Sequence, residues 1–169
     1  MSAALRATAT GILATVVLSL SACGSEPAED LPEPLSVAGP LWQVTDIYLE
    51  PGEPSSIPPD AAGTVGLLFG ESTATGSTGC APLQARVGYH DAGETVPAVE
   101  ATTVVFEQVE FGPTEEDCAG SDAWSHDKMT RLLGSGAEFD LSMSTPTELV
   151  LTRQGEAVDR PSLRLVALR

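Results

Sequence analysis

The 169-residue sequence contains no Asn and a single Lys, Lys128. Without Asn the chain has no acceptor for N-glycosylation. Basic residues are scarce, since 8 Lys and Arg stand against 24 Asp and Glu and the formal net charge is −16. Such a surface repels phosphate groups, so we expect neither nucleic-acid binding nor electrostatic docking on anionic lipid. The hydrophobic content of 42% excludes a fully disordered chain, and the length suits one domain.

Long hydrophobic runs are also missing. The most apolar stretch, Gly11–Leu20, has ten residues and would span only about 15 Å as a helix, roughly half of a bilayer core. It follows one basic residue, Arg6, and it ends directly before Ser21-Ala22-Cys23. This arrangement predicts a signal peptide over residues 1–22 rather than a membrane-spanning helix.

The four residues Leu20, Ser21, Ala22 and Cys23 resemble the bacterial lipobox. The resemblance implies cleavage before Cys23, a diacylglycerol with palmitate-type chains on its thiol, and an extracytoplasmic domain anchored to the cell membrane. Two or more acyl chains on one residue give a stable anchor. The alternative is an ordinary secreted protein in which Cys23 happens to follow the cleavage site. Residues 23–39 are rich in Pro and acids and predict an extended linker.

Two cysteines remain, Cys80 and Cys118. Outside the reducing cytosol a pair of thiols tends to oxidise, so we expect a structural disulfide between them. Two free structural thiols or a reactive thiol are the alternatives. A zinc site is a weak hypothesis, because the sequence has no CxxC spacing and only two His.

Alternating apolar residues predict a mainly β (α+β) fold: a compact antiparallel β-sheet or partial barrel with one α-helix. The expected strands cover residues 40–49, 64–70, 85–90, 95–99, 102–111, 138–143, 148–153 and 162–168, with a further short strand within 71–80. Pro97 favours an edge or a loop for the fourth of these. A change of phase in the first strand predicts a bulge near Asp46.

The segment Ser121–Leu133 predicts the one helix. Ser121 is the expected N-cap and Gly134 the expected stop. We expect one stripe of the helix to be buried, comprising Trp124, Met129, Leu132 and Leu133.

Over roughly residues 40–168 the order of these elements resembles the META/HslJ-like domain family. The similarity is carried by short motifs: Leu41-Trp42, Leu67-Leu68-Phe69, Gly79-Cys80-Ala81, Thr114 with Cys118, Met129–Leu133, and the closing hairpin 139–143 and 148–152. Ala81 stands where the family usually has Asn. The resemblance implies a compact, mostly β domain with one helix over residues 40–169. Such domains are often envelope proteins or lipoproteins linked to stress or antibiotic tolerance, with no agreed reaction.

Candidate chemical groups have ordinary interpretations. Neighbouring side chains on a helix diverge by about 100°, so His126 and Asp127 do not form a base–acid pair, and a solvated helix face is expected. His90 precedes a turn, and Glu115–Asp117 is an acidic loop without EF-hand spacing. Gly76–Gly79 lacks the Lys of a P-loop. We therefore expect no catalytic residue, no metal site and no cofactor.

The leading hypothesis is a non-catalytic, lipid-anchored envelope domain that binds or shields an envelope partner. Its membrane contact would run through the lipid on Cys23, and nucleic acid would not be a partner. A small-ligand carrier at the membrane surface is the second hypothesis. An envelope enzyme that uses Cys80 with His90 or His126 is the third, and it requires a free thiol.

Overall fold

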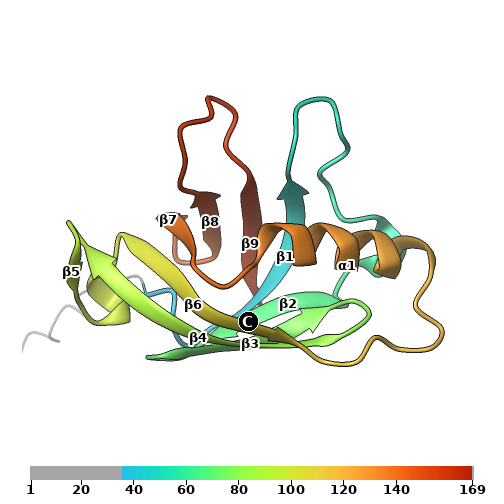
Figure 1. Cartoon of the computed structure of the whole chain (residues 1–169), viewed down its shortest axis with the longest axis horizontal. Coiled ribbons are helices and arrows are strands. Elements are labelled where there is room, and N and C mark those ends of the chain that lie inside the picture. The colour runs from blue at the N-terminus through green and yellow to red at the C-terminus, as the bar shows by residue number, and fades with distance from the viewer. Residues whose placement is uncertain (1–35, 169) are drawn as a thin grey trace, which may run out of the picture. The chain divides into compact units, whose positions relative to one another are not determined.

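The computed structural model describes residues 36–168, and the signal peptide, Cys23 and most of the linker lie outside this part of the chain. The described strands are β1 (Leu41–Tyr48), β2 (Val65–Phe69), β3 (Thr73–Thr78), β4 (Pro82–Asp91), β5 (Glu94–Thr95), β6 (Thr103–Phe111), β7 (Ala137–Thr145), β8 (Glu148–Arg153) and β9 (Ser162–Leu168). One α-helix, α1 (Gly120–Leu132), and two short 3₁₀ helices, η1 (Pro59–Ala61) and η2 (Ala98–Glu100), complete this part (Figure 1).

The strands form one antiparallel barrel. Their order is β3-β2-β1-β9-β8-β7-β6-β4, and the additional pairing of β3 with β4 closes eight of them into a ring. The short β5 pairs only with the end of β4. The predicted mainly β fold with one helix is confirmed, and the sheet closes fully because the weakly patterned segment 73–78 is a true strand between β2 and β4.

Most predicted strand positions are confirmed, and one is wrong. Residues 148–153 and 162–168 form β8 and β9 with the expected bounds. The strand expected over 95–99 is instead β5, which ends at Thr95, followed by η2. Pro97 begins this 3₁₀ turn, since its fixed φ suits a helix start and its missing N–H cannot join a ladder.

The predicted bulge in the first strand is present. The register of β1 against β9 shifts between Val44 and Asp46. The extra residue lets Trp42 and Val44 face the interior before the shift and Ile47 after it, and all three are at most 1% exposed. Both phases of the apolar pattern in β1 therefore reach one core.

Large apolar side chains fill the interior of the barrel. Phe69, Phe106 and Phe139 are at most 1% exposed and meet edge to face, with centroids 6.2 and 5.6 Å apart. Met129, Leu132 and Leu133 join this core from the helix. The interior at this level is packed core rather than a ligand chamber.

The start of α1 differs from the prediction. The helix begins at Gly120, with Ala119 at the N-cap and no side-chain cap. Ser121 is not the cap, because its hydroxyl donates instead to Asp60 of η1, at 2.7 Å. Trp124 is only half-buried, and Ser125 and Lys128 are buried beside Met129 and Leu132.

The folded domain includes residues before 40, so the last three residues assigned to the linker over 23–39 belong to the domain. Val37 is fully buried, and its carbonyl accepts a hydrogen bond from Trp42 Nε1 at 2.8 Å. Ala38 bridges to Phe69, and the Gly39 N–H donates to the Phe69 carbonyl at 3.0 Å. Residues 37–39 are thus part of the fold.

Candidate functional site

Two ends of the barrel can be defined along β1 and its neighbour β9. At one end Leu41 pairs with Leu168, and here, at the entry end, the chain enters the fold. At the other end Tyr48 pairs with Ser162. Here two long loops, residues 49–58 and 154–161, project on the same side of the molecule (Figure 1). We call this the loop end; the seven residue steps from Leu41 to Tyr48 place it about 23 Å from the entry end along the strand.

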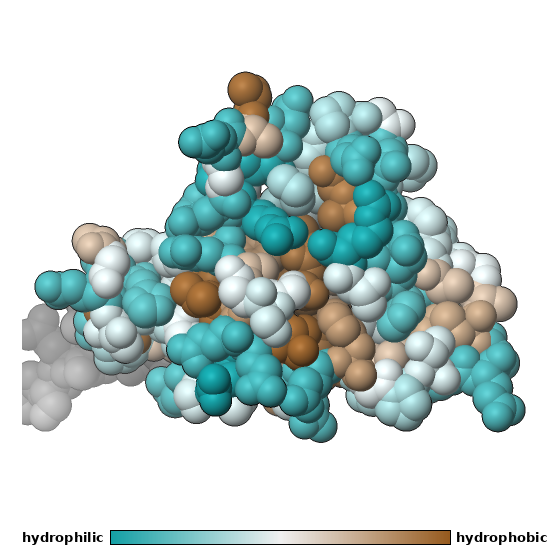
Figure 2. Space-filling model, viewed as in Figure 1, coloured by the Kyte–Doolittle hydropathy of each residue, from teal (hydrophilic) through white to brown (hydrophobic). Residues whose placement is uncertain are grey.

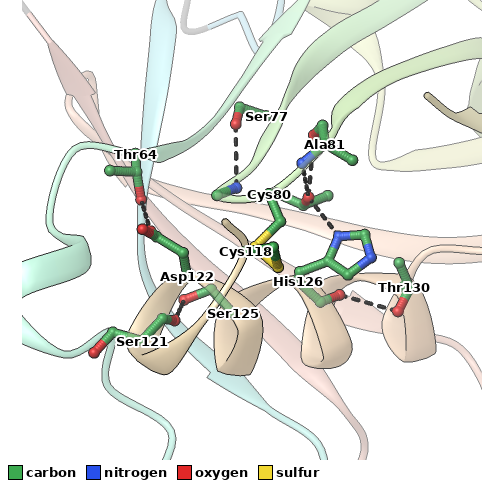
Figure 3. The surroundings of a disulfide bond; sticks show 12 residues. Thr64, Ser77, Cys80, Ala81, Cys118, Ser121, Asp122, Ser125, His126 and Thr130 are labelled. Atoms are coloured by element: carbon green, nitrogen blue, oxygen red, sulfur yellow. Dashed lines mark hydrogen bonds between the residues drawn. A yellow bond between two sulfur atoms is a disulfide. The ribbon is translucent and has the colours of Figure 1, made fainter. Parts of the chain in front are cut away.

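Cys80 and Cys118 form a disulfide, with their Cα atoms 5.3 Å apart (Figure 3). The bond joins the β3–β4 turn to the segment that leads into α1. Cys80 is 1% exposed and Cys118 is half-buried. The structure therefore brings together the two cysteines that the sequence paired, in a position where they fasten the helix to the barrel.

The β3–β4 turn packs directly against the first turn of α1. Gly79 has a φ of +97°, and a Cβ there would meet Asp122 atoms at 3.2–3.3 Å. The Ala81 N–H donates to Thr78 Oγ1 at 3.1 Å. This hydroxyl holds the turn without any polar side chain at position 81, where the resembled family usually has Asn.

His126 is not on a solvated face, contrary to the sequence-based expectation. It is half-buried, and its Nδ1 lies 2.7 Å from Thr78 Oγ1 (Figure 3). Asp127 points elsewhere, since its carboxylate lies 3.7 Å from Arg131. His126 therefore braces the helix against the β3–β4 turn, and its neighbour does not act as its orienting acid.

Of the two histidines in the cysteine-enzyme hypothesis, His126 lies at the β3–β4 turn beside Cys80 and His90 does not. Cys80 is bonded to Cys118, so its sulfur is not a thiolate. His90 sits at the far end of β4, where it pairs with Thr103. Eight residues of β4 separate it from Pro82, which corresponds to about 26 Å.

Two further findings concern metals and membranes. Within residues 36–168, no three His, Cys, Asp or Glu side chains gather in a way that would hold a metal ion. Glu115–Asp117 is an exposed loop. No helix in the described part is both long and apolar enough to cross a membrane.

The loop end carries charged contacts that sequence reasoning missed. The only Lys of the chain, Lys128, is 4% exposed, and its Nζ lies 3.0 Å from Glu53 and 5.0 Å from the Trp124 ring centre. This contact ties the 49–58 loop to α1, and Arg131 binds Glu50 of the same loop at 2.9 Å. An isolated Lys in a helix was the one signal available in the sequence.

The 154–161 loop is held by Asp140 of β7. Its carboxylate binds Arg160 at 2.7 Å and accepts from Gln154 at 2.8 Å. Under the loop lies a depression of about 340 Å³, lined by Tyr48, Thr152, Val158, Asp159, Arg160 and Ser162. Partial burial, and then the charge of Asp159, raise the pKa of Tyr48.

Val158 stands out at this end because it is 99% exposed. Figure 2 shows an apolar tip on this loop in largely hydrophilic surroundings. A fully exposed aliphatic side chain on an anchored loop is a candidate contact for a partner.

Comparison with protein-family models, curated proteins and solved structures found no match. The lipobox residues Leu20, Ser21, Ala22 and Cys23 lie outside the described residues. The lipid anchor and the META/HslJ-like resemblance therefore stay predictions from the sequence.

Proposed function

We propose that this chain is an extracytoplasmic lipoprotein whose barrel is a non-catalytic binding domain at the surface of the cell membrane. The observation that carries the proposal is the Leu20-Ser21-Ala22-Cys23 motif directly after a short apolar run. The Cys80–Cys118 pair supports it, because disulfides persist outside the reducing cytosol. The resemblance to META/HslJ-like domains, which are often lipid-anchored, supports it as well and leaves open a link to stress or antibiotic tolerance.

Replacement of the lipidated residue tests the anchor. The full chain and its Cys23→Ala variant are expressed in a bacterial host and separated by detergent phase partition. We expect the wild-type protein in the detergent phase and the variant in the aqueous phase, since acyl chains alone supply the anchor. Cys80→Ala with Cys118→Ala is the matched control, because it also removes cysteines but keeps Cys23. Equal partition of wild type and Cys23→Ala would contradict the proposal.

The loop end is the proposed binding surface. It lies at the end of β1 opposite to the one at which the described chain enters the barrel. It combines exposed Val158 with the depression beside Tyr48. A small-ligand carrier fits the structure less well, because the interior around Phe106 is packed.

Site-specific photo-cross-linking in intact cells tests this surface. A photoreactive residue replaces Val158 in one strain and Val99, which is 39% exposed on η2, in the control strain. We expect a discrete cross-linked species from position 158 that is weak or absent from position 99. Identical patterns from both positions would contradict binding at the loop end.

A further inference from the structure

The entry end exposes three leucines in one row. Leu41, Leu68 and Leu168 are 49%, 42% and 49% exposed. Leu41 of β1 pairs with Leu168 of β9 on one side and with Leu68 of β2 on the other. Residues paired across neighbouring strands lie on the same face, so the three side chains form one continuous apolar row, here called the leucine row.

The residues paired directly with the leucine row are uncharged. Leu68 pairs with Thr75 on β3, which extends the row by an uncharged residue. The adjacent row runs through Gln43, Gly66 and Ser77 on one side and through Val166 to Glu148 on the other, and Glu148 forms an ion pair with Arg164. Between the rows lies a depression of about 250 Å³ lined by Leu41, Leu168 and Gly66 among others. In a chain with 24 acidic residues, a face with a single acid at its edge, paired with an arginine, is a local exception.

The row lies where the linker joins the fold. Gly39 is hydrogen-bonded to Phe69, the residue after Leu68, so the entering chain is fixed beside the row. Residues 23–35 number 13, and a fully extended chain of this length reaches at most about 45 Å. An anchor at Cys23 would therefore leave the entry end within about 45 Å of the bilayer, near enough for the leucine row to reach it.

We propose that the leucine row contacts the lipid surface and orients the anchored domain, with the loop end pointing away from the membrane. This inference rests on the proposed lipid anchor. Three half-exposed leucines are too small a surface to hold a free protein on a bilayer, but the linker makes their contact intramolecular and raises the effective concentration of lipid. The row itself is uncharged and the acid at its flank is paired with Arg164, so this face experiences less repulsion near anionic lipid than the acidic remainder does.

Fluorescence quenching by lipid tests the orientation. The full lipoprotein is reconstituted into vesicles of phosphatidylcholine and phosphatidylglycerol that contain a nitroxide-headgroup lipid. A single added cysteine takes a fluorophore, either Thr75→Cys beside the leucine row or Glu156→Cys at the loop end; both positions are exposed. We expect at least threefold stronger quenching at position 75 than at position 156. Equal quenching at the two positions overturns the proposal, and this test needs no substitution in the leucine row.

Replacement of the row adds a second test. The triple variant Leu41→Ser, Leu68→Ser, Leu168→Ser is expected to lose the difference between the two labels and still float with the vesicles. The matched control Val99→Ser with Val158→Ser removes exposed apolar side chains elsewhere and is expected to keep the difference. A triple variant that folds, as shown by circular dichroism, and keeps the difference contradicts the role of the row.

The remaining outcomes separate this inference from the anchor. Wild-type protein that does not float with vesicles shows that the anchor is absent, and both proposals then fail. The wild-type protein can also float while the fluorescence of the label at position 75 is the same with and without the nitroxide lipid. If that fluorescence then changes with the number of protein molecules per vesicle, a second copy of the chain covers the row. That result overturns lipid contact and leaves the anchor intact.

Discussion

The entry end and the loop end of this barrel are held by different forces. At the entry end Val37 and Trp42 are fully buried, and the hydrogen bond between them is made in the core. At the loop end ion pairs to Glu53 and Asp140 hold the two loops, and the helix that binds Glu53 is itself fastened to the β3–β4 turn by the Cys80–Cys118 bond. Burial is insensitive to salt and to redox state, whereas the second set of contacts is not.

The entry end is therefore held by packing, whereas the contacts at the loop end can be exchanged. In the proposed arrangement, the end nearer the anchor keeps its shape through packing. A binding end gains from loops whose contacts exchange with those of a partner, because loops on a rigid scaffold can change without loss of the core. Four changes probe this contrast in order of decreasing expected effect: two at the entry end and two in the contacts that hold α1 and the loop end.

Removal of the disulfide is expected to have the largest effect. For a loop of 38 residues, chain entropy gives about 4 kcal/mol in the free energy of unfolding. Cys80→Ala with Cys118→Ala should lower the urea midpoint accordingly and weaken amide protection first in α1. Reductant should shift the midpoint of the wild type and leave that of the double variant unchanged. A urea midpoint equal to that of the wild type would show that the disulfide does not stabilise the attachment of α1.

Trp42→Phe tests the entry end. The change removes the indole N–H that donates to Val37 at 2.8 Å and leaves a small cavity. We expect a loss of about 2–3 kcal/mol, since a buried carbonyl loses its donor and packing is reduced. Urea unfolding should give the same loss in the free energy of unfolding at low and at high salt. A strong salt dependence would contradict the assignment of this end to burial.

Glu53→Gln tests the loop end. It leaves Lys128, whose side chain is 5% exposed, without its carboxylate partner, and we expect a loss of about 1–2 kcal/mol that shrinks at high salt. The matched control is Glu107→Gln, because the Arg86–Glu107 pair has side chains 62% and 45% exposed and should contribute less than about 0.5 kcal/mol. Equal losses in the free energy of unfolding of the two variants would contradict a special role for Lys128.

Tyr89→Phe gives the smallest effect and a pH signature at the entry end. Burial, and then Glu71, raise the pKa of Tyr89 above its ordinary value, and its hydroxyl donates to Gly70 at 2.8 Å. The unfolded chain therefore releases this proton first as pH rises through about 10, so the stabilising contribution is complete below that pH and is lost above it.

The variant should lose about 1 kcal/mol at neutral pH with its hydrogen bond. Above a pH of about 10 the wild type should lose stability faster, so the difference between the two narrows. Guanidinium unfolding from neutral pH to above about 10 measures this difference in the free energy of unfolding. A gap that stays constant or widens with pH would contradict the raised pKa.

Strong alternation in the sequence was enough to place most strands, because period-two patterns report burial on one face directly. β8 and β9 have such patterns and were predicted with their observed bounds. β3 was ambiguous because its residues are small and polar, with only Ala74 and Thr78 buried. Its strand state depends on its neighbours β2 and β4, which the local sequence does not contain.

Contacts between distant segments explain the other errors. Ser121 looks like a helix cap, but Asp60, 61 residues away, accepts its hydroxyl. Lys128 and Glu53 are 75 residues apart, and Thr78 and His126 are 48 apart. The cysteine pair was predictable because two thiols have only one way to combine. The leucine row required the register of three strands.

The first residue of the mature chain is the most direct measure of the central claim. Protein extracted with detergent from the membranes of its bacterial host is digested, and the N-terminal peptide is weighed intact. The account predicts a peptide that begins at Cys23 and carries the added mass of a diacylglycerol. An unmodified Cys23, or a chain that still begins at Met1, would contradict the anchor and the orientation of the barrel built on it.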